Sequence, residues 1–208
     1  MTTRSTTGAA ELAGVEVRGM SRSAFLVRGA LAAGAVYGLG AVRPFVTHAA
    51  MQMDGGDVEI VNFALTLEYL ETDFYGQALE LRLSSDVKPL ARLIYEDESQ
   101  HVDALVATVK QLGGKPAAKP AFSFPMKDEQ SFLELAQTLE DTGVSAYNGA
   151  APSIASAEVL GAAGTIVQVE ARHAAAIRIK NGASPAPDAF DKPLAAKQVL
   201  SAVKPFIG

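Results

Sequence analysis

The sequence predicts an all-α domain: a four-helix bundle of two antiparallel helix hairpins joined by a long crossover, followed by a short C-terminal helix. Three observations lead to this prediction. From residue 57 onward, apolar residues recur at helical spacing, and no segment shows sustained period-two alternation. Gly and Pro divide this region into four long segments. One link between segments is much longer than the others.

The expected helices, taken in order, follow from these breaks. The stretch "LGGKPAAKP" ends the second helix, and "NGASPAPDAFDKP" follows the fourth. Pro152 separates the third from the fourth, and Pro193 suits the first turn of the fifth. The expected ranges are 57–83, 86–112, 128–150, 152–180 and 193–203. We therefore assign the bundle to residues 51–183, and a Pro-rich linker with a short helix to residues 184–208.

The lengths of the links predict how the helices connect. The first and third links have only a few residues, so each joins antiparallel neighbours. The second link, residues 113–127, can reach about 50 Å when extended, more than the roughly 40 Å length of a 27-residue helix. It can run the length of the bundle, so the third helix is expected to begin at the same end as the second.

The first 50 residues differ from the rest of the chain. Arg22 and Arg28 precede an Ala- and Gly-rich apolar run at 29–42, which is shorter than the roughly 20 residues needed to span a bilayer. This pattern predicts an export signal, with membrane contact only during export and a periplasmic or extracellular protein. The stretch "SRSAFLVR" also resembles a twin-arginine signal, with Ser23 in place of the second arginine.

Composition excludes several classes of function. The chain has 208 residues, 49% of them hydrophobic, and a net charge of -5. With no basic cluster in the predicted bundle, a nucleic-acid partner is not expected. The absence of cysteine removes disulfides and thiol chemistry, so a metal site must be built from His, Asp and Glu.

The two predicted hairpins are copies of each other. When the sequence is aligned with itself so that Glu68 falls on Glu140, apolar positions coincide, and so do a Glu-x-x-His motif and a Tyr. The coinciding polar pairs are Glu68 with Glu140, Tyr75 with Tyr147, Glu98 with Glu170, and His101 with His173. The first Glu of each hairpin is therefore equally far along the chain from the Glu-x-x-His motif that follows it.

These polar residues lie within the apolar stripes of their helices. Glu98 and His101, for example, share a face with Ile94 and Leu105. Four buried carboxylates without compensation would cost many kcal/mol, whereas two divalent cations would balance their charge. One Glu from each of two helices and Glu-x-x-His from the other two is the di-iron or di-manganese carboxylate pattern.

A family resemblance rests on these same residues. Residues 57–180 resemble the ferritin-like superfamily, and "NFALTLEYLETDFY", "YEDESQHVDAL" and "LEDTGVSAYNGA" resemble its exported bacterial branch related to desiccation-associated proteins of plants. The resemblance implies a dinuclear centre of two iron or manganese ions. The residues that match its metal ligands are Glu68, Glu98, His101, Glu140, Glu170 and His173.

Other polar residues near the motifs have weaker assignments. Tyr75 and Tyr147 match tyrosines that bond a ligating carboxylate, although core aromatics with satisfied hydroxyls are an alternative. Glu71, Glu96 and Asp97 have no acidic counterpart in the second hairpin, so we expect them to be solvated or to lie behind the ligands.

Three functions remain open. The first is an enzyme that reacts with O₂ or peroxide, either a ferroxidase or a peroxide-detoxifying protein in stress protection. The second is a non-enzymatic desiccation or stress protein with a structural or vestigial metal site. The third is iron storage in a cage, which the short fifth helix disfavours. Small residues such as Ala155 and Gly161 predict a homodimer face.

Overall fold

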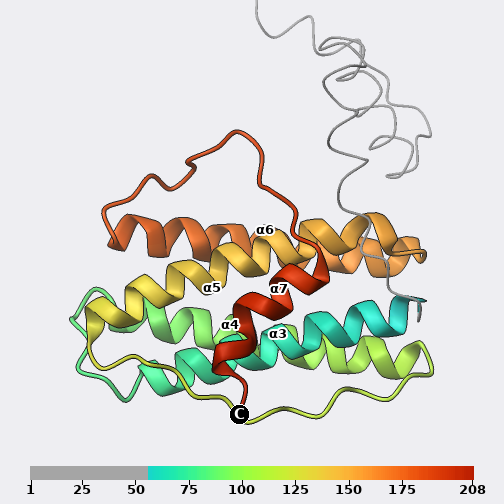
Figure 1. Ribbon diagram of the computed structural model, residues 1–208, viewed down its shortest axis with the longest axis horizontal. Coiled ribbons are helices and arrows are strands. Elements are labelled where there is room, and N and C mark those ends of the chain that lie inside the picture. The colour runs from blue at the N-terminus through green and yellow to red at the C-terminus, as the bar shows by residue number, and fades with distance from the viewer. Residues whose placement is uncertain (1–55) are drawn as a thin grey trace, which may run out of the picture. The chain divides into compact units, whose positions relative to one another are not determined.

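Residues 56–208 are described by the computed structural model, and the export signal predicted for residues 1–50 lies outside them. The described part is helical and contains no strand, apart from an isolated antiparallel bridge between Phe122 and Ile207. This confirms the all-α prediction. The helices are α3 (Gly56–Ala78), α4 (Lys88–Gln111), α5 (Glu129–Ala150), α6 (Ala157–Lys180) and the short α7 (Ala196–Val203), with 3₁₀ turns η2 (Ala151–Ser153) and η3 (Lys204–Phe206) (Figure 1).

The long link after α4 runs along α3. Near the start of α3, the Asn62 side chain donates to the Lys115 carbonyl at 3.1 Å and accepts from the Ala117 backbone N–H at 2.7 Å. Further along α3, the Lys119 ammonium pairs with Asp73 at 2.5 Å. The link therefore travels from the start of α3 towards its end. This is the crossover predicted from its length (Figure 1).

The helices α4 and α5 begin at the same end of the bundle. The Ser84 backbone N–H, which precedes α4, donates to the Glu129 carboxylate in the first turn of α5. Asp128 caps α5 by accepting from the backbone N–H and the hydroxyl of Ser131. The two hairpins, α3 with α4 and α5 with α6, are thus joined by one long crossover, as the sequence predicts.

Helix α3 ends at Ala78, before the predicted end at residue 83. Beyond it, Leu79, Leu81 and Leu83 are half-buried against the core, whereas the residues between them are exposed. The chain turns there instead of continuing the helix, because the Glu80 and Leu81 backbone N–H groups donate to the Gln77 and Ala78 carbonyls, three residues back. The prediction of a helix to residue 83 was wrong. It relied on the high helix propensity of leucine, but Leu79, Leu81 and Leu83 pack against the core after the helix has ended.

Helix α6 begins at Ala157 rather than at residue 152. Pro152 lies instead in the 3₁₀ turn η2, and Ser156 caps the helix by accepting from the Val159 backbone N–H at 3.3 Å. The Asp57 carboxylate accepts from two further N–H groups of this turn, those of Ala155 and Ser156, and so fixes it to the start of α3.

The C-terminal segment covers α5. After α6, Gly182 adopts a φ of +69°, which ends the helix, and the chain to residue 195 arches away from the bundle (Figure 1). It returns where the Leu194 N–H donates to the Ser145 carbonyl at 3.0 Å. Helix α7 begins at Ala196, slightly later than the predicted start at residue 193, and buries Val199 and Val203.

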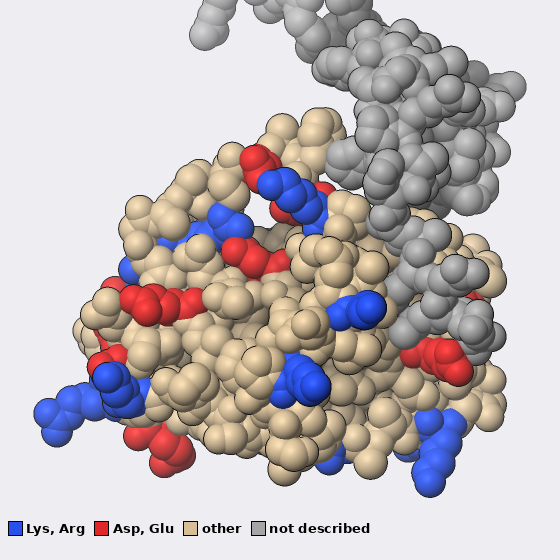
Figure 2. Space-filling view, viewed as in Figure 1, with Lys and Arg blue, Asp and Glu red and all other residues tan. Residues whose placement is uncertain are grey.

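Two apolar clusters fill the bundle. The larger includes Phe74, Tyr75 and Phe132, whose rings pack at centroid distances of 5.1 to 5.8 Å. The smaller includes Leu65 and Tyr147. On the face shown in Figure 2, Lys and Arg side chains do not gather into one basic patch, and several lie beside Asp or Glu. Within residues 56–208, no helix is long and apolar enough to span a membrane.

Candidate metal centre

The six polar residues repeated in the two hairpins meet in the interior of the bundle. Each of the four long helices contributes to the cluster. Glu68 comes from α3 and Glu140 from α5, while α4 and α6 each supply a Glu-x-x-His pair. All four carboxylates are fully buried, and the exposed fractions of His101 and His173 are 9% and 3%. The polar residues thus occupy core positions, as their places in the apolar stripes predict.

These residues form two groups of four that share two members. The first group is Glu68, Glu98, His101 and Glu170, and the second group is Glu98, Glu140, Glu170 and His173. Within each group, one oxygen or nitrogen per residue lies within 4.8 Å of those of the others. Glu98 and Glu170 belong to both groups. Two ions bound in these groups would therefore be bridged by two carboxylates.

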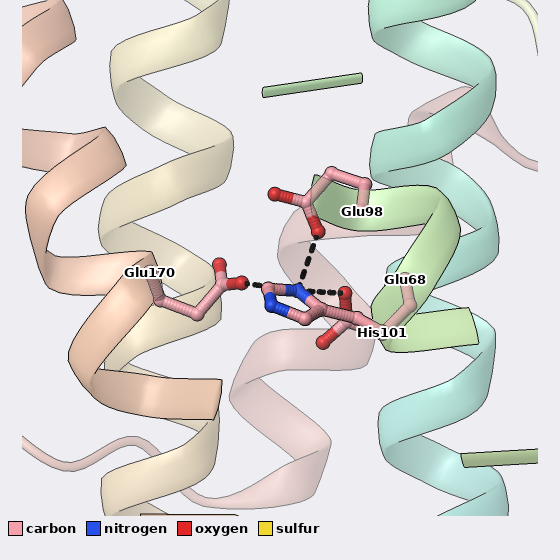
Figure 3. A group of neighbouring side chains, drawn as sticks. All are labelled: Glu68, Glu98, His101 and Glu170. Carbon is pink, nitrogen blue, oxygen red and sulfur yellow. Dashed lines mark hydrogen bonds and ion pairs between the residues drawn. The ribbon is translucent and has the colours of Figure 1, made fainter. Parts of the chain in front are cut away.

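In the first group, three carboxylates converge on one imidazole nitrogen. His101 Nδ1 lies 3.2 Å from Glu68 Oε2, 3.1 Å from Glu98 Oε2 and 3.1 Å from Glu170 Oε1 (Figure 3). A single nitrogen can take part in only one strong hydrogen bond at a time. The three oxygens and this nitrogen together therefore resemble the ligand atoms around a metal ion more than a hydrogen-bond network.

The second group supports the same conclusion more directly. His173 Nδ1 lies 2.9 Å from Glu98 Oε1, yet neither atom is aligned for a hydrogen bond. Both oxygens of Glu170 and Oε2 of Glu140 are also buried without a hydrogen-bond partner. Leaving buried polar atoms unsatisfied costs about 1–3 kcal/mol each, more if charged. A cation between these atoms would satisfy them together.

Each tyrosine supports a carboxylate of the other hairpin. Tyr75 in α3 donates its hydroxyl to Glu140 Oε1 in α5, and Tyr147 in α5 donates to Glu68 Oε1 in α3. Both tyrosines are buried. Each hydrogen bond leaves the second oxygen of its carboxylate for the centre, and it holds that carboxylate in one orientation.

His173 has an acidic partner, and the duplicated sequence provides no such residue for His101. The Asp97 carboxylate lies 3.2 Å from His173 Nε2, so it can accept the proton of that nitrogen and leave Nδ1 as a donor to an ion. At the position that corresponds to Asp97 in the second hairpin, the chain has Val169. The duplication is therefore not exact around the two imidazoles.

Three of the four carboxylates of the metal-free centre have a raised pKa, and the fourth, Glu68, has a lowered one. Burial, followed by repulsion from Glu170, raises the pKa of both Glu98 and Glu140 well above the ordinary value. Burial, followed by repulsion from Glu68, raises the pKa of Glu170 to about 7. Burial acts in the same direction on Glu68, but hydrogen bonds, led by that of His101, outweigh it and lower the pKa. Without an ion, burial and mutual repulsion therefore favour the protonated forms of Glu98, Glu140 and Glu170.

The two imidazoles have opposite shifts. Burial disfavours the His101 cation, but the nearby carboxylates of Glu170, Glu68 and Glu98 outweigh burial and raise the pKa of His101 to about 12. Burial lowers the pKa of His173, although Asp97 partly offsets this. The metal-free centre therefore holds one imidazolium and several carboxylic protons, charges that two divalent ions would replace.

The donor set fits particular metals. Oxygen donors with two imidazoles, and no cysteine in the chain, suit iron or manganese rather than copper(I) or a structural zinc site. Four carboxylates neutralise two divalent ions, and the neutral imidazoles complete the donor set. The observed burial and the unsatisfied atoms are consistent with a dinuclear site of this kind.

Two cavities approach the centre. One, of about 540 Å³, is lined by both imidazoles together with Asp97, Gln100 and Arg172. The other, of about 100 Å³, is almost entirely apolar and reaches the Tyr147 ring. The larger cavity would give a small polar oxidant access to the histidine side of the centre.

The three acidic residues with uncertain roles have separate environments. Glu96 is exposed, and Asp97 contacts His173. Glu71, by contrast, is buried with an exposed fraction of 3%, close to the repeated cluster. Sequence comparison of the hairpins did not find Glu71, because its counterpart is Gly143. Its position one turn beyond Glu68, on the same helical face, was the available signal.

Comparisons with known proteins agree with this architecture. The model of the ferritin-like domain family matches residues 56–182. A conserved hypothetical protein from Mycobacterium tuberculosis has 21% identity and a TM-score of 0.56, covering 64% of this chain and 94% of its own. A structure from Bacillus anthracis, described as ferritin-like, diiron-carboxylate proteins, has 22% identity and a TM-score of 0.55, covering 59% and 93%. These identities establish a shared fold alone. No curated protein matches the chain.

Proposed function

Because the chain belongs to the ferritin-like domain family, we propose that it binds two iron or manganese ions and reacts with O₂ or peroxide, as a ferroxidase or peroxide-detoxifying protein. One observation carries this proposal: two groups of buried metal-binding side chains share Glu98 and Glu170. Shared carboxylates would hold two ions close enough to act on one oxidant molecule.

The chain's own residues have distinct roles in this proposal. Glu98 and Glu170 would help to hold both ions, while Glu68 and Glu140 would each help to hold one. The hydroxyls of Tyr75 and Tyr147 orient Glu140 and Glu68 respectively. The two imidazoles line the 540 Å³ cavity, through which the oxidant would arrive.

The ions would supply electrons, and the chain would supply a water-poor cage around them. Two Fe²⁺ ions held by these residues would supply the two electrons that, with two protons, reduce one peroxide molecule to two water molecules. With manganese, two peroxide molecules would instead yield O₂ and two water molecules. The acidic groups around the centre retain protons in the metal-free state, and ion binding displaces them.

A reconstitution experiment tests this function. The full chain, freed of metal, is loaded anaerobically with two equivalents of Fe²⁺ or Mn²⁺ and then given peroxide or O₂. We expect oxidant to be consumed, with Fe²⁺ oxidised in proportion. A Glu98→Ala, Glu170→Ala double variant removes both shared carboxylates and serves as the control. Consumption no faster than in this variant would contradict an enzymatic role.

A structural role for the ions is the second candidate. It is supported by the arrangement of the ligands, because they connect all four long helices of the bundle. In that case ions would raise the melting temperature without oxidant consumption, because a ligand that binds only the folded state stabilises it. The same reconstituted sample distinguishes the two candidates, since it can be melted before and after oxidant is added.

Export is a separate proposal, based on residues 1–50. Arg22 and Arg28 before the short apolar run support it. Fusion of residues 1–50 to a reporter that is active only outside the cytoplasm would test it. We expect activity from this fusion, and its loss after replacement of Arg22 and Arg28 by Gln. An inactive original fusion would contradict export. Blocking the twin-arginine pathway, with its own substrates retained in the cytoplasm as the control, would show whether this protein uses the same route.

A further inference from the structure

One buried carboxylate near the centre has no counterpart in the duplicated pattern. Glu71 lies on α3, one helical turn beyond Glu68, and only 3% of its surface is exposed. It is not a member of either group of four. Burying a carboxylate requires a compensating partner, and the four carboxylates already present repel it. A cation nearby would compensate for that burial.

Space for Glu71 comes from α5. Its counterpart in the second hairpin is Gly143, which follows Glu140 by one turn on the same helical face. A Cβ atom added at Gly143 would lie 3.0 Å from Glu71 Oε1 and 3.2 Å from Glu170 Oε2. The Glu71 carboxylate therefore reaches across from α3 and fills the place that a side chain at position 143 would occupy.

The side of Glu170 on which Glu71 lies indicates which group it serves. Glu170 Oε1 faces His101, a member of the first group only, at 3.1 Å. The other oxygen, Oε2, is the one beside Gly143 and hence beside Glu71. Gly143 also lies one turn from Glu140, which belongs only to the second group. Glu71 therefore lies towards the second group.

A second departure from the duplication lies on the same side. Asp97 contacts His173, which belongs to the second group, and its counterpart Val169 can offer His101 no such contact. Glu71 and Asp97, two acids without an acidic counterpart in the second hairpin, thus both lie beside the second group. An imidazole whose distal nitrogen bonds a carboxylate is the stronger donor, and an additional negative charge favours a cation.

We propose, as an extension of the proposed function on which it rests, that Glu71 is an additional carboxylate ligand of the ion held by Glu98, Glu140, Glu170 and His173. The two ion positions are then unequal. The ion of the second group binds more tightly and is loaded first. The ion of the first group, held by three carboxylates rather than four, is bound more weakly and exchanges more readily.

Binding of Mn²⁺ without oxidant tests this inference. Free Mn²⁺ is measured by electron paramagnetic resonance during titration of the metal-free full chain. We expect two unequal steps for the unchanged protein. In Glu71→Gln, the tighter step should weaken by about 10- to 100-fold, the range typical for loss of a carboxylate that supports a metal site.

Adding Glu71→Gln to two other variants identifies which of the two ions Glu71 helps to hold. Glu68→Gln weakens the first group and leaves the second, so adding Glu71→Gln should weaken the remaining site. Glu140→Gln weakens the second group and leaves the first, so adding Glu71→Gln should have little effect there. Equal effects of Glu71→Gln in both backgrounds, or none in either, would overturn the inference.

A glycine pair supplies a test that keeps the carboxylate. Gly143→Ala places a methyl group against both Glu71 and Glu170. Because Glu170 belongs to both groups but Glu71 serves only the second, the tighter step should weaken more than the other, whereas Gly161→Ala on α6, where a Cβ meets no atom within 4 Å, should leave both unchanged. Circular dichroism confirms that each variant is folded. If the unchanged protein binds no Mn²⁺ or Fe²⁺, the proposed function itself fails. If it binds two ions and Glu71→Gln binds them identically, only the inference about Glu71 fails.

Discussion

The pH dependence of stability in the metal-free protein gives a quantitative test of the centre. The pKa of Glu170 is raised from 4.5 to about 7 by burial and by the other carboxylates, led by Glu68. A group whose pKa is raised on folding contributes stability that is complete below its unfolded pKa. That stability is lost as the pH rises through the folded pKa. Metal-free protein should therefore become less stable between pH 4.5 and pH 8.

The size of this loss follows from the shift. Each pKa unit corresponds to about 1.36 kcal/mol, so Glu170 alone contributes about 3 kcal/mol. For a domain of this size, that is roughly 10 °C in melting temperature. The raised pKa values of Glu98, Glu140 and His101 act in the same direction. The lowered pKa of His173 acts in the opposite direction, because its contribution is lost as the pH falls.

Thermal unfolding in the presence of a chelator, from pH 5 to pH 8, measures this loss. The unchanged protein should melt at a lower temperature at pH 8, and Glu170→Gln should show a smaller decrease because its side chain cannot ionise. Glu158→Gln, at an exposed position of the same helix, is the matched control and should keep the full decrease. A melting temperature that is constant or rises over this range would refute the reasoning, and so would an unchanged slope in Glu170→Gln.

Three further predictions concern the same regions. Loading two divalent ions at pH 7 should release protons, because ion binding displaces the proton of His101 and those that the raised pKa values favour on Glu98, Glu140 and Glu170; an indicator dye in weak buffer measures the release. Release of no protons would contradict the protonated centre. Tyr147→Phe should lower the free energy of unfolding by about 1–3 kcal/mol, because the Glu68 carboxylate loses a buried hydrogen bond, whereas Tyr95→Phe at a half-buried position should have a smaller effect in the same denaturant titration. Gly149→Ala should destabilise by about 1–3 kcal/mol, because its Cβ would lie 2.0 Å from the Leu194 carbonyl oxygen, and a loss no greater than that of Gly161→Ala would show that the C-terminal segment moves aside freely.

The sequence predicted the helices and the repeated cluster because both leave periodic signals. Glu98 and His101 lie on an apolar face, and their counterparts Glu170 and His173 do the same. Features without such a period were missed. Residues 79–83 were assigned to the first helix, whereas the chain turns after Ala78 and packs alternate leucines against the core. The burial of Glu71 depends on a contact across the bundle with Gly143, which a comparison of identical residues discards.

The way the two hairpins share their ligands has a consequence for how the protein holds together. The first group takes Glu68, Glu98 and His101 from the first hairpin but Glu170 from the second, and the second group reverses this division. The tyrosine hydrogen bonds also cross from each hairpin to the other. Neither hairpin can therefore form a complete group by itself. Because the ions require both hairpins, their binding energy acts on the contact between the hairpins rather than within either one. The metal-free protein should accordingly open first between its hairpins, and hydrogen exchange should show that added metal protects the faces of α4 and α6 around the centre more than the helix ends.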